Sequence, residues 1–571
     1  MSTPEIPVQH INGDPLNDDQ RRYLEGFFAG LAAHGVRFGD VEPAPAPGKT
    51  VSRDDLIFEE RVKHELHPLD AYDQITENAV SNKAPDKEEI FRFKWNGLFF
   101  LTPNKEAFMA RLRIPGGLLK TFQLRELADI AKALTSGYIQ ITTRANLQMR
   151  LIQPKDCPEF LRRVQSVGLH TRGSGADNIR NLTANPTAGI DPHELIDVLP
   201  LCQELGQIII NDRSFYDMPR KFNIAYDGGG LIGTVEDTND IGAKAVKVGD
   251  EVLFRIALGG ATGHKAFARD IGVWVKPSEL NSVVVALVRV YIANGNRGDR
   301  KKARLKHLLE TWSLDKYLAE AEKILGKKLP RSPLDPAAIQ YPGQKLPHSH
   351  VGVYAQRQAG LNYIGVAMPV GQITAKQMLR VAEIADLYGS GEIRLTVWQN
   401  FIIPNVPDAY VGTVEKALRK IGFDTRQSML RGGLIACTGS SYCKFAQANT
   451  KAHAIALADY LEKKVALDQP VNIHLTGCPN SCAQHYMGDI GLLGTKVKGE
   501  DGYHVFIGGG FGANQAVGRQ IFTGLTVEGL KTTLESMLKS YLRHREPNEP
   551  FQKFTARHDL NTLQAFFTND E

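Results

Sequence analysis

Residues 127–131 read LADIA and residues 381–385 read VAEIA, and the two stretches lie 254 positions apart. The same offset relates all of residues 112–169 to residues 366–423 without a gap. The identical pairs are Pro115 and Pro369, Gly117 and Gly371, Gly137 and Gly391, Thr142 and Thr396, Asn146 and Asn400, and Gly168 and Gly422. An internal repeat of this length indicates a duplicated fold, so each copy predicts the structure of the other.

Each copy predicts the same order of elements. In the first copy a strand over residues 110–114 leads through a Pro-Gly turn to a helix over 125–134, and strands over 138–143 and 147–152 precede a second helix that ends at Gly168. The second copy predicts a strand over 365–368, a helix over 378–388, strands over 392–397 and 401–404, and a helix that ends at Gly422. This β-α-β-β-α order is the topology of a ferredoxin-like split unit, a name that implies no iron.

The duplication also organises the rest of the chain, whose 571 residues have the length of about four domains. We predict an internally duplicated α/β (α+β) fold in which each half contains a ferredoxin-like half-module followed by a larger α/β module. Duplicated halves often hold a ligand where they meet, so we expect a central cofactor site. The predicted parts are an arm over residues 1–65 (with a helix over 16–36 and a Pro-rich stretch over 43–48), half-modules over 85–170 and 345–425, and larger modules over 171–330 and 426–571.

The composition limits the classes of protein. With 42% hydrophobic and 23% charged residues, the chain can bury a sizeable core and is neither disordered nor collagen-like. No apolar run approaches 18 residues, and the first residues lack a basic segment followed by an apolar one, so we expect a cytoplasmic protein without membrane contact. A net charge of +5 is too small for nucleic-acid binding but suits an acidic partner or a polyanionic ligand.

Four of the six cysteines lie within 46 residues, in the segments ACTGSSYC (436–443) and TGCPNSC (476–482). Their spacing is C-x5-C, then 34 residues, then C-x3-C. Four thiolates suit a cubane iron–sulfur cluster, which takes one per iron. A four-cysteine zinc site remains an alternative, although zinc motifs usually separate paired cysteines by two to four residues, and unligated structural thiols are a third. The other two cysteines, Cys157 and Cys202, are expected to be buried small hydrophobes.

Basic residues gather beside predicted turns and strand ends. Arg111 and Arg113 lie on one face of the first strand, Arg144 follows a Thr-Thr pair, and Arg180 lies in the segment DNIRN. The other members of this group are Arg220, Lys221, Lys301, Lys302, Arg304 and Lys306. Any one of them alone is most simply a solvated surface charge, but together they suit a polycarboxylate and a small anion.

The two copies of the repeat differ at these cationic positions. Arg111 aligns with Gly365, and Arg144 aligns with Trp398. The second copy therefore lacks both charges, while the cysteines lie only in the second half. We infer that one half supplies a cationic site and the other half supplies the cysteines.

The chain resembles the nitrite and sulfite reductases that contain sirohaem and a 4Fe-4S cluster. The resemblance is carried by ACTGSSYC, TGCPNSC, FMARLRIPGG, TTRANLQ, DNIRN and MPRKFN, and it covers about residues 90–545. It implies that Cys437, Cys443, Cys478 and Cys482 hold the cluster, and that the sulfur of Cys482 also bridges to the sirohaem iron.

The resemblance also implies roles for the basic residues. Arg111, Arg180 and Lys221 would face the substrate pocket as catalytic residues. Sirohaem carries eight carboxylates, so it requires many cationic partners. The residues expected to bind it are Arg113, Arg144, Asn146, Arg220, Asn223, Arg304 and Lys306, in addition to Cys482.

Asn223 bears on the choice of substrate, because sulfite-type members of this family usually carry a lysine at this position. Its presence, with DNIRN and the segment NPTAGIDPHE (185–194), favours the six-electron reduction of nitrite to ammonia, and reduction of sulfite to sulfide is the alternative. A precorrin-3B synthase-like monooxygenase of the cobalamin pathway and a non-catalytic iron–sulfur electron carrier are alternatives of other classes.

The source of electrons must be another protein, because no flavin or NAD(P) segment is evident in the sequence. An acidic ferredoxin or flavodoxin fits the net charge of +5. We expect a monomer, and we expect neither nucleic acid nor a membrane among its partners.

Overall fold

The computed structural model places most of the chain. It describes residues 10, 11, 14, 15, 18, 21, 56–101, 106–331, 339–340, 350–426 and 428–568. The chain forms two compact units, Met1–Asp55 and Leu56–Glu571. In the first unit, β1 (His10–Ile11) pairs with β2 (Asp14–Pro15); the predicted helix over 16–36 and the Pro-rich stretch over 43–48 lie outside the described residues.

The second unit begins with three helices, α2 (Phe58–Glu65), α3 (Tyr72–Val80) and α4 (Lys87–Arg92). Val62 of α2 is fully buried in a core cluster, and Lys63 of α2 donates to the carbonyl of Met218 (3.1 Å). Helix α2 is thus part of the packed second unit, although it lies within residues 1–65, the range predicted for the arm.

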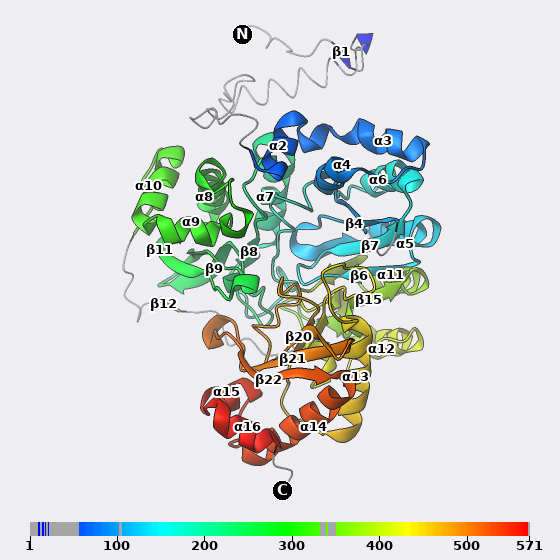
Figure 1. Ribbon diagram of the computed structural model, residues 1–571, viewed down its shortest axis with the longest axis vertical. Helices are drawn as coiled ribbons and strands as arrows, with labels where there is room; N and C mark the ends of the chain where they lie inside the picture. The colour runs from blue at the N-terminus through cyan, green and yellow to red at the C-terminus, as the bar shows by residue number, and fades with distance from the viewer. Residues whose placement is uncertain are drawn as a thin grey trace. The chain divides into compact units, whose positions relative to one another are not determined.

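Both half-modules follow the predicted β-α-β-β-α order (Figure 1). The first contains β3 (Leu98–Phe100), β4 (Phe108–Arg111), β5 (Leu118–Lys120), α5 (Thr121–Leu134), β6 (Tyr138–Ile141), β7 (Leu147–Ile152) and α6 (Cys157–Ser166). The second contains β13 (Gly352–Ala355), β14 (Leu361–Val366), β15 (Gln372–Thr374), α11 (Ala375–Tyr388), β16 (Glu392–Leu395), β17 (Phe401–Pro407) and α12 (Val411–Lys420).

The predicted first strands extend too far toward the C-terminus in both copies. The backbone N–H of Arg113 donates to the carbonyl of His170 (2.6 Å), and that of Ile114 donates to the side chain of Asn181 (2.7 Å). In the second copy the N–H groups of Ala367 and Met368 likewise bond to residues outside the neighbouring strand. These backbone groups leave the sheet ladder, so β4 and β14 end earlier.

The two half-modules exchange a strand, which the sequence did not predict. Strand β5 pairs with β16 of the second copy, and β15 pairs with β6 of the first copy. The sheet orders are therefore β13-β14-β17-β16-β5 and β15-β6-β7-β4-β3. Equivalent residues of the two copies form the equivalent pairs: Leu119 pairs with Ile393, and Ile373 pairs with Ile139.

Two equivalent glycines make this exchange possible. A Cβ on Gly117 would lie 2.8 Å from the carbonyl oxygen of Leu395, and a Cβ on Gly371 would lie 2.6 Å from that of Ile141. Both glycines also have positive φ angles, +73° and +74°. Only glycine fits where the backbones of the two copies approach so closely.

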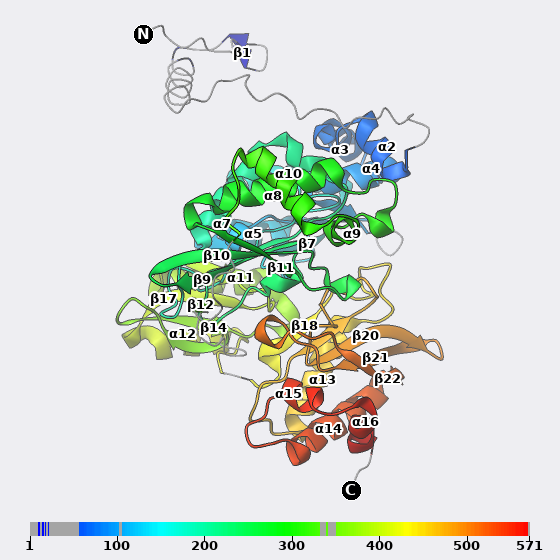
Figure 2. The ribbon, with the colours of Figure 1, turned by 90° about the vertical axis from the view of Figure 1, so that its left-hand side faces the viewer.

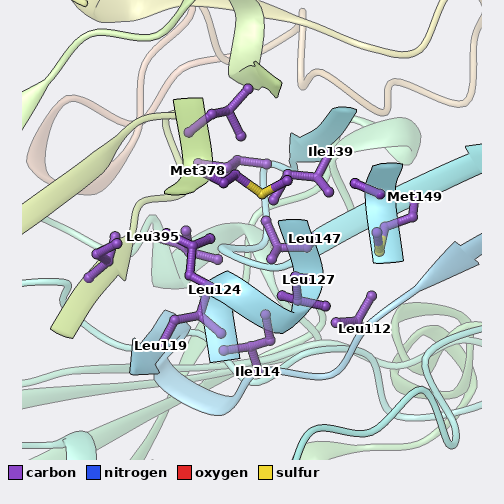
Figure 3. Close-up of a cluster of buried hydrophobic side chains, with 14 of the residues drawn as sticks. Leu112, Ile114, Leu119, Leu124, Leu127, Ile139, Leu147, Met149, Met378 and Leu395 are labelled. Carbon is purple, nitrogen blue, oxygen red and sulfur yellow. The ribbon is translucent and has the colours of Figure 1, made fainter. Parts of the chain in front are cut away.

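One hydrophobic core joins the two half-modules. Leu119 and Leu127 of the first copy share a buried cluster with Met378 and Leu395 of the second (Figure 3). Helices α5 and α11 pack against each other and contribute side chains to this core, among them Leu127 and Met378. The half-modules therefore form a single structural body.

The larger modules each build a mixed sheet (Figure 2). The first contains α7 (Leu199–Asn211), β8 (Ile224–Asp227), β9 (Ile241–Val248), β10 (Glu251–Leu258), β11 (Arg269–Val275), α8 (Leu280–Asn294), α9 (Leu305–Thr311), α10 (Leu314–Leu325) and the paired β12 (Ile339–Gln340). The second contains β18 (Leu434–Ala436), α13 (Thr450–Lys464), β19 (Ile473–Thr476), β20 (Ile490–Val497), β21 (Glu500–Ile507), β22 (Arg519–Thr526), α14 (Val527–His544), α15 (Phe551–Ala556) and α16 (Leu560–Thr568). Each module has its own buried core.

The larger modules are also copies of one another. Strands β8, β9 and β10 recur as β19, β20 and β21 at a constant offset of 249, with the same parallel and antiparallel pairings. This second repeat was not predicted, although the octapeptides IGAKAVKV (241–248) and IGLLGTKV (490–497) are similar in sequence.

Alanine at Gly371 is expected to lower the thermal unfolding midpoint, because its Cβ would collide with a backbone carbonyl and its φ is unfavourable. Gly137→Ala is the matched control, since Gly137 also has a positive φ (+81°) but nothing lies within 4 Å of an added Cβ. Thermal unfolding followed by circular dichroism should show a clearly larger decrease for Gly371→Ala. Equal decreases would mean that the close approach of the two copies contributes no constraint.

Candidate functional site

A cavity of about 420 Å³ is lined by the first half-module, both larger modules and Gln399 of the second half-module. Its described lining includes six arginines and three lysines, and no aspartate or glutamate is among those lining residues. These cations are Arg111, Arg144, Arg180, Arg220, Lys221, Arg300, Lys301, Arg304 and Lys451. The volume is within the range of ligand sites, and the charge favours a polyanionic ligand.

Arg144 reaches the cavity from the turn between β6 and β7. The N–H of Thr142 donates to the carbonyl of Asn146 (2.9 Å), and Ala145 at the tip has a left-handed φ of +48°. Asn181 holds the turn by donating to the carbonyl of Arg144 (2.8 Å). The guanidinium of Arg144 donates to the side chain of Asn239 (2.9 Å).

Arg111 and Arg180 share one backbone acceptor. Nη1 of Arg111 and Nη1 of Arg180 both donate to the carbonyl of Ser174, at 3.2 and 3.3 Å. Burial lowers the pKa of Arg111 to about 10, and burial together with Arg111 holds the pKa of Arg180 well below its usual value. Nε of Arg180 has no hydrogen-bond partner among the described residues, so this side chain can still bind an acceptor.

Arg220 and Lys221 lie on the segment that α2 holds through Met218. Arg220 pairs with the buried carboxylate of Asp177 (3.4 Å), which also accepts two hydrogen bonds from Arg300 (2.8 Å each). Burial, with repulsion from Arg304, lowers the pKa of Lys221 to about 7. The chain thus maintains a lysine where burial and neighbouring charges oppose its protonation.

Asn223 and Arg304 meet at a buried carboxylate. The guanidinium of Arg304 donates to Asp240 from Nε (3.2 Å) and Nη2 (2.7 Å), and the N–H of Asn223 donates to the same carboxylate (2.9 Å). The amide of Asn223 satisfies both of its neighbours in one orientation, in which its oxygen accepts from Nη2 of Arg144 (3.0 Å) and its nitrogen donates to the carbonyl of Phe222 (3.2 Å). Both residues line the cavity.

Two of the residues predicted to bind cofactor lie outside the cavity lining. Arg113 is 3% exposed, and its guanidinium donates to the carbonyls of Arg172, Gly173, Ile179 and Arg180. It therefore organises the loop that carries Arg180. Lys306 pairs with Glu310 on α9 (3.2 Å). Asn146 lines the cavity, while its amide donates to the carbonyl of Leu112 (2.7 Å) and so also fixes the Arg144 turn.

The structure adds cavity residues that the sequence analysis did not single out. Arg300 directly precedes the predicted lysine cluster, so its position was a usable signal. Lys451 lies on α13, beside the cysteine loop, and its Nζ donates to the carbonyls of Val370 and Ala436. Burial lowers its pKa to about 7. Nothing in the sequence around Lys451 distinguishes it from a surface lysine.

Parallel strands bring the two cysteine pairs together. Cys437 follows β18, Cys478 follows β19, and the N–H of Cys437 donates to the carbonyl of Leu475 (3.0 Å). The N–H of Gly477 points at Sγ of Cys437 (3.2 Å). A Cβ on Gly477 would lie 2.6 Å from that of Ala446, so glycine is needed for the segments to approach.

The four thiols influence one another electrostatically. Burial raises the pKa of Cys478 to about 11, and Cys482, Cys443 and Cys437 each contribute to the rise. No three His, Cys, Asp or Glu side chains among the described residues are arranged to hold a single metal ion. The four cysteines lie on the two loops that follow β18 and β19, and four thiolates suit a cluster that binds one thiolate per iron.

Cys482 connects the cysteines to the cationic cavity. Its surface is exposed toward the cavity, which it lines together with Cys437. Its carbonyl accepts from Oγ1 of Thr143 (3.2 Å), next to Arg144. Burial and the neighbouring cysteines raise its pKa, while Lys221 and Arg111 oppose the rise. The predicted cluster ligands and substrate-pocket cations therefore share one site.

Comparisons with known proteins agree with this arrangement. The model of the nitrite and sulphite reductase 4Fe-4S domain matches residues 175–329 and 432–568, and that of the nitrite/sulfite reductase ferredoxin-like half domain matches residues 102–167 and 354–421. The chain is 37% identical to ferredoxin–nitrite reductase of Synechococcus elongatus, over 86% of this chain and 97% of that protein. It is 30% identical to sulfite reductase (ferredoxin) 1 of Mycolicibacterium paratuberculosis, over 90% of this chain and 97% of that protein.

A solved structure shares the architecture. The Mycobacterium tuberculosis NirA protein matches with a TM-score of 0.81 at 28% sequence identity, covering 89% of this chain and 97% of that chain. The fold and the site define a duplicated redox protein with ferredoxin-like half-domains. The chain belongs to the nitrite and sulfite reductase family.

Family membership decides several of the predictions. The chain is an oxidoreductase, and its cofactors are a 4Fe-4S cluster and sirohaem, as predicted. The 4Fe-4S cofactor is confirmed, and so is the duplicated α/β fold with ferredoxin-like half-modules, while the assignment of the four cysteines to the cluster stays a prediction. Within the described part of the chain, no helix has both the length and the apolar character needed to cross a bilayer.

Proposed function

We propose that this protein reduces nitrite to ammonia with six electrons supplied by a ferredoxin-type carrier. The observation that supports it most is the position of Cys482 on the wall of a cavity lined by nine cations. A redox cluster ligand and an anion-binding surface are thereby in contact. Relatives named ferredoxin–nitrite reductase, at 37% identity over most of both chains, support nitrite as the anion and ferredoxin as the donor.

The residues present fit both cofactors. Cys437, Cys443, Cys478 and Cys482 would hold the cluster, and the cavity cations would pair with the sirohaem carboxylates. When bound, sirohaem supplies the iron at which the substrate is reduced, and the sulfur of Cys482 would link it to the cluster. The protein's own contribution is binding, orientation and electrostatics.

Arg111, Arg180 and Lys221 would bind the substrate anion. The charges of the two arginines, and that of Lys221 when it is protonated, attract the anion and stabilise negative charge on its oxygens. Ser174 holds both arginines through one carbonyl, so they approach the anion as a preformed pair. Preformed donors avoid reorganisation during the reaction, which is why such sites are effective.

Sulfite is the second candidate, because the relative named sulfite reductase (ferredoxin) 1 is 30% identical over 90% of this chain. Asn223 favours nitrite: it is neutral, and its oxygen already accepts a hydrogen bond from Arg144. A lysine there would add a charge that suits the larger and more anionic sulfite. The precorrin-3B synthase-like and electron-carrier alternatives predict no sirohaem absorption.

Cytoplasmic location, a monomeric state, flavodoxin as donor and the module boundaries stay predictions.

Steady-state turnover with nitrite and sulfite side by side, using a reduced dye as donor, tests the proposal. We expect a higher kcat/KM for nitrite, and a purified protein with a Soret-like band and a red band from sirohaem. Iron and acid-labile sulfide without sirohaem, after expression with a sirohaem supply, would overturn the reductase proposal. A higher kcat/KM for sulfite would overturn the choice of nitrite.

Asn223→Lys should shift the ratio of the two kcat/KM values toward sulfite. The change removes the acceptor of Arg144 and adds a cation that Arg144 and Arg304 repel toward the cavity. Asn294→Lys, on the exposed end of α8, adds the same charge outside the cavity and is the control. An unchanged ratio in Asn223→Lys would mean that this position does not select the anion.

Cys482→Ser should lose both cofactors together, because one sulfur is proposed to serve both. Iron, acid-labile sulfide and sirohaem absorbance per chain measure the loss. Cys157→Ser is the control, since Cys157 is a buried thiol on α6 away from the cavity lining. Normal cofactor content and activity in Cys482→Ser would exclude the bridging role.

A further inference from the structure

The second repeat places the same Asn–Asp frame in both larger modules. Asn223 and Asp240 precede β8 and β9, and Asn472 and Asp489 precede β19 and β20 at the offset of 249. In each copy the asparagine N–H donates to the aspartate Oδ2 at 2.9 Å. The following strand also begins alike, because the N–H of Ile241 or Ile490 donates to the asparagine carbonyl (3.0 and 3.1 Å). The two frames therefore have the same backbone hydrogen bonds, and they differ in the contacts of their side chains.

In the second copy the side chain of the asparagine forms two hydrogen bonds with the aspartate. Nδ2 of Asn472 donates to Asp489 (2.7 Å), and Oδ1 of Asn472 accepts from the N–H of Asp489 (2.8 Å). No cation contributes to the pKa of this carboxyl, which burial raises to about 7. The whole amide of Asn472 is used inside this pair, and Asn472 is not among the cavity-lining residues.

In the first copy an arginine takes the place of the amide. Nε and Nη2 of Arg304 occupy both carboxylate oxygens of Asp240, and the pair is buried, with Arg304 5% and Asp240 1% exposed. Only the backbone N–H of Asn223 still reaches Asp240. The side chain of Asn223 instead turns to Arg144, on the cavity wall.

We infer that the Asp240–Arg304 ion pair is a positioning device that turns the amide of Asn223 out of its frame and into the cavity. This inference rests on the proposed function, in which the cavity binds the anion to be reduced. Asp240 and Arg304 act through Asn223, and Asn223 in turn holds one side of the Arg144 guanidinium while Asn239 holds the other. Anion selectivity then depends on the Asp240–Arg304 salt bridge as well as on the groups that contact the anion.

Arg304→Met tests the inference, because it recreates in the first copy the arrangement that the second copy already shows to be stable. In a crystal structure of the variant, the amide nitrogen of Asn223 should lie on Asp240, as that of Asn472 lies on Asp489. The KM for nitrite should rise about tenfold, the loss expected for one hydrogen bond to a charged group, with a smaller change in kcat. Arg304→Lys keeps a cation on Asp240 and should restore the KM in large part.

A double variant distinguishes positioning from direct binding. If Arg304 acts only through Asn223, then Arg304→Met combined with Asn223→Ala should be no worse than the worse single variant. If Arg304 acts independently, the two effects should multiply. Arg289→Met is the matched control. Arg289 is an exposed arginine of α8 that pairs with Asp212 (3.1 Å), and its loss should leave the KM for nitrite as in the unchanged protein.

The outcomes separate this inference from the proposed function. If the unchanged protein reduces nitrite, the inference fails when the side chain of Asn223 stays on Arg144 in Arg304→Met, or when the effects of the two substitutions on the KM multiply. It also fails when sirohaem absorbance per chain falls in Arg304→Met while the KM for nitrite is unchanged. That last result would make Arg304 a cofactor ligand. If the unchanged protein does not reduce nitrite, the proposed function fails, and the crystallographic orientation of Asn223 still decides whether the salt bridge controls it.

Discussion

The constraint on which this structure depends is the confinement of nine cations around one cavity without a carboxylate among the lining residues. Burial lowers the pKa values of Arg111 and Arg144 to about 10 and those of Lys221 and Lys451 to about 7, and repulsion from neighbouring arginines adds to the decrease at Arg144, Lys221 and Lys451. Such a site is unfavourable by itself and becomes favourable when an anion occupies it. Carbonyls such as that of Ser174, and buried carboxylates outside the lining such as Asp177 and Asp240, hold the cations in place.

Duplication supplies the rigid support for this arrangement. The exchanged strands β5 and β15 join the half-modules through one core, so the turn carrying Arg144 rests on both copies. The larger modules then face the same site with related backbones and different side chains. The first contributes Arg180, Lys221 and Arg304, and the second contributes the cysteines. One symmetric scaffold thus holds a charge-rich wall opposite a sulfur-rich wall.

The sequence predicted what depends on periodicity and chemistry. The helices of both half-modules, the meeting of the cysteines and most of the cavity cations follow from spacing and residue type. Three-residue strands such as β5 and β15 carry no periodic signal, so their exchange between copies could not be predicted. Arg113 was expected to bind the cofactor but lies outside the described cavity lining, because strand alternation gives its face but not the carbonyls that satisfy it. Lys451 has no local signal, since only the fold brings α13 to the site.

Comparing the copies explains why the frame at Asn223 carries so much of the site's chemistry. An asparagine whose amide closes on a neighbouring aspartate, as Asn472 does, is satisfied and therefore inert. A cation on that aspartate leaves the amide without its partner, and a buried amide without a partner is unfavourable unless it finds another. In the first copy the amide nitrogen finds the carbonyl of Phe222 and the amide oxygen finds Arg144. A substitution of Arg304, whose guanidinium is bonded to the buried Asp240, therefore changes the chemistry of the cavity while the backbone hydrogen bonds common to both copies stay the same.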